Sequence, residues 1–205
     1  MAKEENKEKN IGVVLLAAGE SKRLGRPKQL LSFSGNTFLQ HALKAATASN
    51  ASTIITVLGA SADSMKEEIG NTNIAVNIDW REGMASSIRT GVKALMELEP
   101  ETEAAILMVC DQPYVDAALL NNLIETHLKT GKTVVACSYQ NTFGPPALFH
   151  KSLFPELLQL YGDVGARSVV KQHADEVEVI LFPKGEIDID TEADYQKLSK
   201  QVSGQ

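Results

Sequence analysis

Short apolar runs rich in β-branched residues alternate with segments of helical period along this chain, and the alternation limits the folds open to it. Six runs have the length and composition of buried strands, at residues 11–17, 53–58, 74–78, 104–109, 133–137 and 177–182. Because these runs are apolar throughout, and not only at every second position, we expect both faces of their sheet to be covered. Strands that alternate with helices in this way favour a mostly parallel sheet between two helical layers.

Helical periodicity is clearest in three of the intervening segments, at residues 37–49, 84–98 and 116–131. Their apolar side chains recur every three or four residues, as on the buried face of a surface helix. Asp116 and Gly131 are suitable caps for the third helix. The stretch 139–149 contains NTFGPPALF, which is too short for a helical crossover and so predicts an antiparallel insertion.

A single domain accounts for most of the 205 residues, because no repeat or low-complexity linker divides them. We expect this domain at residues 11–200, preceded by a charged flexible arm at residues 1–10. The net charge of −6 argues against a nucleic-acid binder. The apolar runs fall far below the ~20 residues of a membrane span, and the arm lacks the apolar core of a signal peptide. These features predict a cytoplasmic protein without nucleic-acid or membrane partners, in which Cys110 and Cys137 are buried.

The first strand leads directly into a loop rich in glycine and basic residues, with the sequence IGVVLLAAGESKRLGRPKQLL. In open α/β sheets, ligands bind beyond the carboxyl ends of the strands, which is where this loop begins. The loop fits neither the Walker pattern nor G-x-G-x-x-G, but its chemistry suits a polyphosphate. Ala17, Ala18 and Gly19 allow the backbone to approach a ligand. Arg23 and Lys28 can then neutralise phosphate charge.

Three acidic residues lie at or near other strand ends. Asp111 follows an apolar run in MVCDQP, and Asp188 and Asp190 alternate with isoleucines in EIDIDT. A period of two places the latter pair on the same side of an extended segment. Together with phosphate oxygens, these carboxylates predict a site for a hard cation such as Mg²⁺, or for Mn²⁺. The alternative interpretation of the last segment is a helix cap, made by Asp190 or Thr191.

These motifs and NIDWREGMASSI, taken together in their order, resemble those of the MobA-like nucleotidyltransferases. The resemblance extends from Ile11 to about Leu198. It is strongest toward the molybdenum cofactor cytidylyltransferase branch, which is often paired with molybdenum hydroxylases such as xanthine dehydrogenase. It implies a Rossmann-like, three-layer nucleotide-diphospho-sugar transferase fold, whose mostly parallel sheet has one antiparallel strand. This chain departs from the family pattern at two places. It has Gly-Pro-Pro at residues 144–146, in the acceptor region, where close relatives tend to have Gly-His-Pro. It has Thr-Glu at residues 191–192, where relatives tend to have Thr-Pro, and this difference affects only the start of a helix.

The resemblance also assigns roles to residues of this chain. Catalytic roles fall to Arg23, Lys28 and Asp111, and the metal would be held by Asp111 with Asp188 or Asp190. Nucleotide binding is implied for Ala17, Ala18, Gly19, Arg23, Lys28, Gly83, Met84 and Ser87. The turn at residues 83–87 would lie beside the nucleobase, where Gly83 permits close approach. GPPALF and GDVGARSVV would lie in the acceptor region, although a plain loop before a helix explains residues 162–165 equally well.

The implied reaction is attack by a phosphate oxygen of the acceptor on the α-phosphorus of CTP, with pyrophosphate as the leaving group. The acceptor would be a phosphorylated, molybdopterin-type cofactor, and the expected protein partner is a molybdenum hydroxylase or its maturation factor. A guanylyl- or sugar-phosphate transferase is the alternative enzyme. A nucleotide-binding accessory protein for hydroxylase maturation is the non-catalytic alternative. A redox protein is less consistent with the sequence, because the glycine fingerprint of dinucleotide binding is missing.

Overall fold

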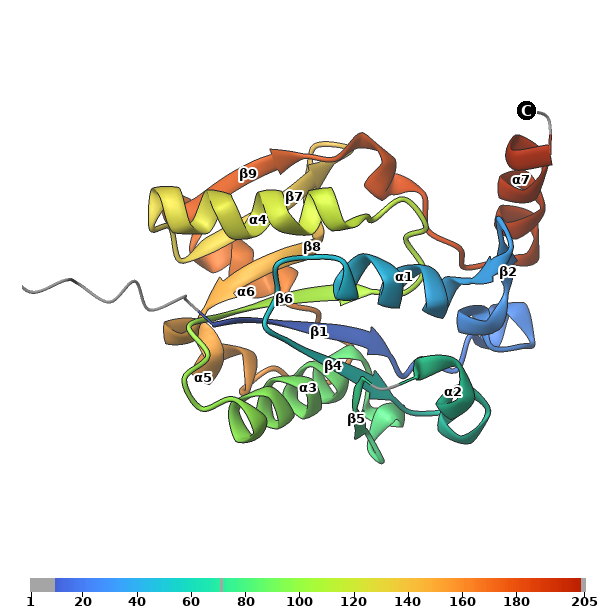
Figure 1. The fold of residues 1–205 in the computed structure, drawn as a ribbon, viewed down its shortest axis with the longest axis horizontal. Coiled ribbons are helices and arrows are strands. Elements are labelled where there is room, and N and C mark those ends of the chain that lie inside the picture. Colours follow the sequence, from blue (N-terminus) through green and yellow to red (C-terminus); the bar gives the residue numbers. More distant parts are fainter. Residues whose placement is uncertain (1–9, 71, 204–205) are drawn as a thin grey trace, which may run out of the picture.

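A computed structural model describes residues 10–70 and 72–203, and in this part of the chain seven strands form one sheet with helices on both faces (Figure 1). The predicted α/β architecture is therefore confirmed. The predicted arm at residues 1–10 lies outside the described residues, except for Asn10.

The main sheet has the strand order β5-β4-β1-β6-β8-β7-β9. Its strands are β1 (Ile11–Ala17), β4 (Thr53–Leu58), β5 (Asn73–Val76), β6 (Ala104–Val109), β7 (Val134–Tyr139), β8 (Thr142–His150) and β9 (Val177–Leu181). Neighbouring strands pair in parallel, except that β8 pairs antiparallel with both β6 and β7. Because β8 contains GPPALF, the predicted antiparallel insertion is confirmed.

The helices alternate with these strands. The α-helices are α1 (Phe38–Thr47), α2 (Ala62–Ile69), α3 (Met84–Leu98), α4 (Ala117–Thr130), α5 (Phe154–Leu157), α6 (Arg167–Gln172) and α7 (Glu192–Ser203). Shorter elements that matter below are the 3₁₀ helices η1 (Lys22–Leu24), η2 (Lys28–Leu30), η3 (Trp80–Glu82) and η6 (Pro183–Glu186) and the hairpin of β2 (Ser32–Phe33) and β3 (Asn36–Thr37). The predicted caps Asp116 and Gly131 flank α4. Among the described residues, no helix is both long and apolar enough to cross a bilayer.

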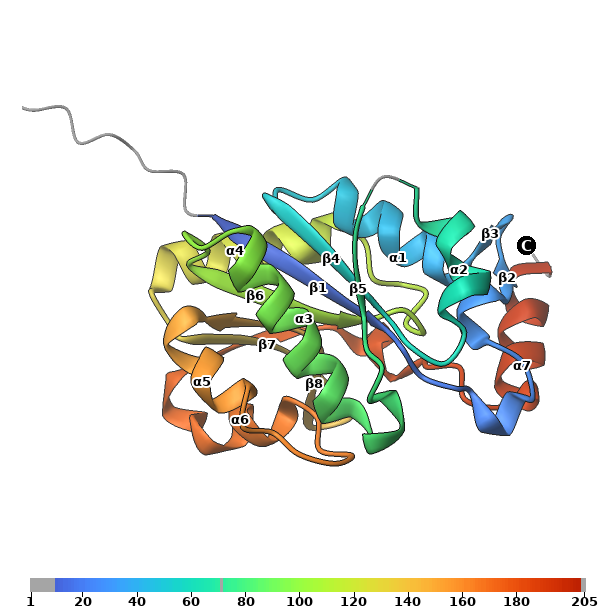
Figure 2. The same ribbon diagram turned by 90° about the horizontal axis from the view of Figure 1, so that it is seen from below.

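The central strand β1 shows how the sheet is stabilised, because all of its residues are buried. Val13 and Leu15 face a cluster shared with α1, α2 and α4, whereas Val14 and Leu16 face a cluster shared with α3, α5 and α6. The second group of helices covers the near face of the sheet in Figure 2. Burial of apolar side chains on both faces explains why the strand sequence has no polar alternation.

The sequence located the main strands to within a few residues, but it did not predict the short helices α2 and α5. Helix α2 buries only Met65 and Ile69, so its apolar pattern is too sparse to stand out. Strand β5 ends two residues before its predicted limit, and Ile78 is exposed. Cys110 and Cys137 are buried free thiols, as predicted.

The carboxyl ends of β1, β4 and β6 point toward one edge of the domain, where α7 also lies (Figure 1). A small cluster of Leu31, Phe38, Ile189 and Leu198 fixes the C-terminal segment at this edge. This cluster is separate from the two that cover the faces of the sheet. Residues from the beginning and the end of the described chain therefore meet beyond the strand ends.

Candidate functional site

A cleft at this edge consists of two adjoining cavities. The inner cavity has a volume of about 210 Å³ and the outer cavity a volume of about 570 Å³. The residues of interest in the inner cavity are Ala17, Ala18, Gly19, Lys28, Gly83, Met84, Ser87 and Asp111. Those in the outer cavity are Gly19, Arg23, Lys28, Trp80, Gly83 and Asp190. The structure therefore brings all the residues predicted to bind nucleotide to one cleft.

Gln29, which sequence reasoning did not single out, organises the loop after β1. Its side chain is buried, and its Nε2 donates hydrogen bonds to the carbonyl oxygens of Ala17 at 2.9 Å and Gly19 at 2.8 Å. The backbone amide of Lys28 donates to Ser21 Oγ at 3.0 Å, which closes the loop on itself. These hydrogen bonds between side chains and backbone of the same loop hold it in one conformation. A lone glutamine among loop residues gives no sequence signal of this role.

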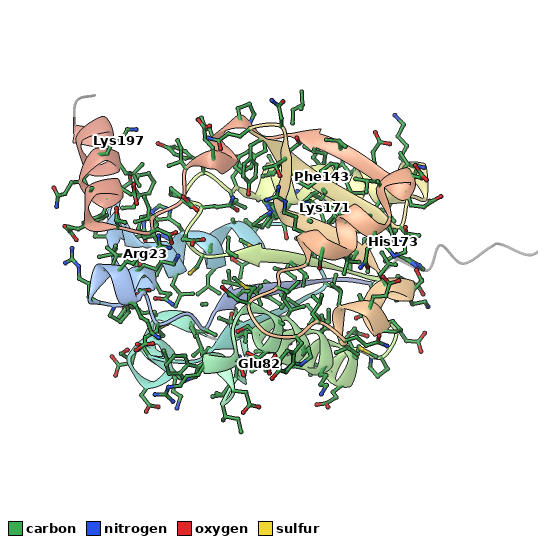
Figure 3. All side chains as sticks on the ribbon, turned by 180° about the vertical axis from the view of Figure 1, so that it is seen from behind. Arg23, Glu82, Phe143, Lys171, His173 and Lys197 are labelled. Carbon is green, nitrogen blue, oxygen red and sulfur yellow. The ribbon has the colours of Figure 1, made fainter. Side chains whose placement is uncertain are left out.

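Lys28 stands at the centre of a charge cluster that three distant segments form. Its Nζ makes ion pairs with Asp111, which follows β6, and with Asp190 Oδ1 at 3.1 Å. Asp190 Oδ2 also accepts a hydrogen bond from Arg23 Nη2 at 2.6 Å. Figure 3 shows Arg23 close to the base of α7, on the loop that follows β1. The Lys28 and Asp111 side chains are only 17% and 15% exposed, so their ion pair is largely shielded from water.

The charges of this cluster shift the pKa values of its members. Burial alone would lower the pKa of Lys28, but the carboxylates of Asp111 and Asp190 raise it above its ordinary value. Burial would raise the pKa of Asp190, yet its contacts with Lys28 and Arg23 lower it. Burial, reinforced by the negative charges of Asp111 and Asp190, raises the pKa of Asp188. At neutral pH, Lys28 therefore carries its positive charge and Asp190 its negative charge.

The carboxylates in the cleft suit a cation that is partly coordinated by substrate. No group of three or more His, Cys, Asp and Glu side chains within the described ranges is arranged to hold a metal ion. Asp111 Oδ1 is nonetheless buried without a hydrogen-bond partner in this part of the chain, and Asp190 approaches the same ammonium group as Asp111. Mg²⁺ is usually held by one or two carboxylates together with phosphate oxygens. The donor set of Asp111 and Asp190 therefore fits a cation that arrives with a triphosphate.

Asp188 and Asp190 do not occupy equivalent positions, in contrast to the expectation from their spacing. Asp190 lines the outer cavity, whereas Asp188 lines a separate cavity of about 360 Å³ together with Asp194. The segment between η6 and α7 is not a strand, so a period of two does not set the direction of its side chains. The hydroxyl of Thr191 accepts a hydrogen bond from the amide of Asp194 at 3.2 Å. Thr191 thus caps α7, while Asp190 joins the charge cluster.

The start of α3 rests on Asn77, another residue that sequence reasoning missed. Its buried side chain donates from Nδ2 to Ser86 Oγ at 2.8 Å and to Ser87 Oγ at 3.0 Å. Its Oδ1 accepts a hydrogen bond from the amide of Asp79 at 2.9 Å. These bonds join the segment after β5 to the first turn of α3. They fix the wall of the inner cavity to which Met84 and Ser87 belong.

Gly83, directly before α3, has a backbone conformation that glycine alone adopts without strain. Its φ is 124°, and a Cβ at this position would lie 2.6 Å from the carbonyl oxygen of Gly162. The close approach at Gly83 is therefore to a neighbouring loop, and not only to a ligand. We expect Gly83→Val to displace that loop, to raise the KM for nucleotide and to lower the free energy of unfolding by about 1–3 kcal/mol. Steady-state kinetics and urea unfolding measure both effects, and an unchanged KM would contradict the expectation.

A third, apolar cavity of about 130 Å³ adjoins the inner cavity. The two share Leu16, Met84 and Val109, and the third cavity is also lined by Gly144 and residues 165–167. Parts of GPPALF and GDVGARSVV therefore meet beside the cleft, where the resemblance implies that an acceptor lies.

Comparisons with known proteins agree with this architecture. Residues 13–177 match the family model of the MobA-like NTP transferase domain. A nicotine blue oxidoreductase of Paenarthrobacter nicotinovorans is 31% identical over 82% of this chain and 84% of the relative. The purine catabolism protein PucB of Bacillus subtilis (strain 168) is 28% identical over 93% of this chain and 96% of the relative. The solved structure of Rv0371c from Mycobacterium tuberculosis H37Rv in complex with manganese gives a TM-score of 0.77 at 30% identity, covering 94% of this chain and 100% of that chain.

Proposed function

The chain belongs to the MobA-like NTP transferase family, and on this basis we propose that it transfers a CMP group from CTP to a phosphorylated, molybdopterin-type acceptor, with release of pyrophosphate. The observation that carries the proposal is the meeting of Lys28 with Asp111 and Asp190 in the cleft at the end of β1. A cationic side chain beside two carboxylates is what a triphosphate and its divalent cation require together.

The side chains of this cleft would act by holding and neutralising the triphosphate. Lys28 and Arg23 supply positive charge where negative charge develops on the leaving pyrophosphate. Asp111 and Asp190 would hold Mg²⁺ or Mn²⁺, which supplies further neutralisation of the phosphates when it is bound. The acceptor phosphate is already largely anionic at neutral pH, because its second pKa is about 6. The proposed reaction therefore needs no general base.

Two of the similar proteins support parts of this proposal. The Mycobacterium tuberculosis relative was solved with manganese, which is consistent with a divalent cation in this cleft. The Bacillus subtilis relative is named for purine catabolism. That name is consistent with a cofactor made for a molybdenum hydroxylase such as xanthine dehydrogenase, whose substrate is a purine. A molybdenum hydroxylase, or its maturation factor, in the cytoplasm is the partner that we propose.

The nucleotide preference can be tested directly. We expect CTP to be used in clear preference to GTP and ATP, because the motifs of this chain most resemble those of the cytidylyltransferase branch. The measurement is pyrophosphate release from each of the four ribonucleotides, with molybdopterin-type and sugar-phosphate acceptors in parallel. Preferred use of GTP would move the chain to the guanylyl branch, and preferred use of a sugar phosphate would replace the acceptor.

A second candidate function follows from the nicotine blue oxidoreductase among the relatives, which is 31% identical to this chain. It predicts that the purified protein has oxidoreductase activity toward nicotine blue. Absorbance of this dye at constant protein concentration measures the activity. Such activity, without pyrophosphate release under any of the conditions above, would favour the redox function over nucleotidyl transfer.

A further inference from the structure

The loop of residues 160–165 is fastened to the start of α3 by an ion pair. Arg89 donates to both carboxylate oxygens of Glu82, at 2.7 Å to Oε1 and 2.6 Å to Oε2. Arg89 Nη1 also donates to the carbonyl oxygen of Leu160 at 2.6 Å. Glu82 Oε1 in turn accepts a hydrogen bond from the amide of Gly162 at 3.1 Å. Because a bidentate arginine–carboxylate pair has a fixed geometry, it holds the loop at two points.

Backbone packing adds to this attachment. The amide of Ala85 donates to the carbonyl oxygen of Gly162 at 3.1 Å. The backbone of Gly162 and Asp163 lies directly against Gly83, where no Cβ has room. The side chains of Glu82 and Arg89 are 19% and 22% exposed, so water has limited access to their ion pair. Figure 3 labels Glu82 beside α3. The loop therefore holds Asp163 in a defined place at the cleft.

Asp163 lines both the inner and the outer cavity. Asp111 lines only the inner cavity and Asp190 only the outer one, so Asp163 lies at the junction. No residue in the described part of the chain donates a hydrogen bond to its carboxylate. The following residues, Gly165 and Arg167, line the apolar third cavity instead. The loop thus separates two binding regions, and Asp163 is on the nucleotide side.

The chemistry of the two cavities indicates which part of a nucleotide meets this junction. The inner cavity includes the apolar side chains of Leu16 and Met84, which suit a base, and the outer cavity includes Arg23, which suits phosphates. Lys28 lines both cavities and Asp111 lines the inner one, so the phosphates and their cation extend to the junction of the two cavities. The ribose joins the base to the phosphates and so lies beside that junction. An ionised carboxylate accepts hydrogen bonds and repels phosphate. It is therefore suited to the hydroxyl groups of a ribose.

We propose that Asp163 is a specificity-determining residue that recognises the 2′- and 3′-hydroxyl groups of the nucleotide. This proposal rests on one part of the proposed function, namely that a nucleotide binds in the cleft. It requires neither cytosine nor transfer to an acceptor. It also separates Asp163 from its neighbours in GDVGARSVV, all of which the resemblance places in the acceptor region.

The test compares the binding of CTP and 2′,3′-dideoxy-CTP in the presence of Mg²⁺ and without acceptor. Trp80, which is the sole tryptophan of the sequence and lines both cavities, provides a fluorescence signal, and calorimetry confirms each Kd. We expect the natural protein to prefer CTP about tenfold, the low end of the effect of one hydrogen bond to a charged group, because Asp163 is exposed. Asp163→Ala should abolish this preference, and Asp163→Asn, which keeps a neutral acceptor, should give an intermediate value.

Two further variants separate ribose recognition from charge and from loop position. Glu20→Gln removes the same charge from a residue that lines only the outer cavity, so it should change both Kd values by the same factor. Glu82→Gln weakens the attachment of the loop without altering Asp163. It should reduce the CTP preference and increase hydrogen exchange at the amides of residues 160–165.

The outcomes that would overturn the proposal are distinct from those that concern the proposed function. The proposal is overturned if Asp163→Ala keeps the preference for CTP over 2′,3′-dideoxy-CTP. It is also overturned if the natural protein shows no such preference. If Asp163→Ala weakens the binding of CTP and of 2′,3′-dideoxy-CTP equally and also weakens Mn²⁺ binding, Asp163 is a metal ligand and the proposal is wrong. If CTP does not bind, the ribose comparison is made with whichever ribonucleotide does. Failure of all four to bind overturns both proposals, whereas ribose preference without transfer removes only the transferase activity.

Discussion

We expect Lys28→Ala to lower kcat by about 10²–10³-fold, the loss that follows removal of one preorganised electrostatic donor from an active site. The ammonium group of Lys28 is largely buried and lies between Asp111 and Asp190, so no other side chain can replace its charge without moving. Its partners in the cluster keep it protonated at neutral pH, because they hold its pKa above the ordinary value. Single-turnover measurement of pyrophosphate release reports the chemical step directly.

A matched control for this substitution is available in the same loop. Lys22→Ala removes the same charge, but the Lys22 side chain is 80% exposed and pairs only with Glu20 among the described residues. Lys22 also lines the outer cavity, but water screens its exposed charge, so the control should change kcat far less. Equal effects of the two substitutions would show that the loop acts only through its total charge. Near-natural turnover of Lys28→Ala would remove Lys28 from the catalytic site.

Activity is expected to depend strictly on Mg²⁺ or Mn²⁺ and to fall sharply in Asp111→Asn. The substitution preserves the shape of the side chain and removes one negative charge from a position where Oδ1 is buried without a partner. We expect kcat to fall by about 10²-fold or more, comparable to the loss of other electrostatic groups in active sites. The free energy of unfolding should fall as well, because Lys28 loses a charge that compensates its burial, but the loss of catalysis should be much the larger effect, since Asn keeps an acceptor for Lys28 and Asp190 remains its partner. Metal titrations of activity and urea unfolding measure the two quantities.

Asp190→Asn and Asp188→Asn complete this comparison. Asp190 shares Lys28 with Asp111, whereas Asp188 lines a different cavity, so the larger loss of metal-dependent activity should come from Asp190→Asn. Because the Asp188 charge also acts on Asp111 and Asp190, its variant measures the electrostatic effect of an acid of the same segment that does not line the two cavities of the cleft. Full activity in EDTA, or an active Asp111→Asn protein, would refute the metal assignment and favour a protein that only binds nucleotide.

Sequence patterns predicted the parts of this molecule whose cause is local or periodic. The apolar runs identified the central strands because burial on both faces leaves no polar alternation, as in β1. Lys28 and Asp111 were found because parallel strands deliver their carboxyl ends to one edge, which makes residues after β1 and β6 neighbours.

The remaining contributions to the cleft depend on contacts that no local pattern records. Gln29 and Asn77 stand out only once their side chains are seen to be buried and bonded to a loop or a helix start. Glu82 and Arg89 belong to two different helices, η3 and α3, so no helical spacing marks their ion pair, and its role follows from the loop that packs on it. The choice between Asp188 and Asp190 was equally out of reach, since it depends on the path of an irregular segment.

The contact between Lys28 and Asp190 spans 162 positions of the chain, and this separation has a consequence for the order of folding. Closing so long a loop costs conformational entropy, so such contacts form late. Strands β5, β4, β1 and β6 are adjacent in the sheet and all lie within the first 109 residues, so they can assemble first. Synthesis on the ribosome imposes the same order, because the loop after β1 is synthesised early and the EIDIDT segment late. A nascent chain therefore holds the loop and Asp111 in place well before the second acid arrives, and it gains its complete set of charges in the last step of folding.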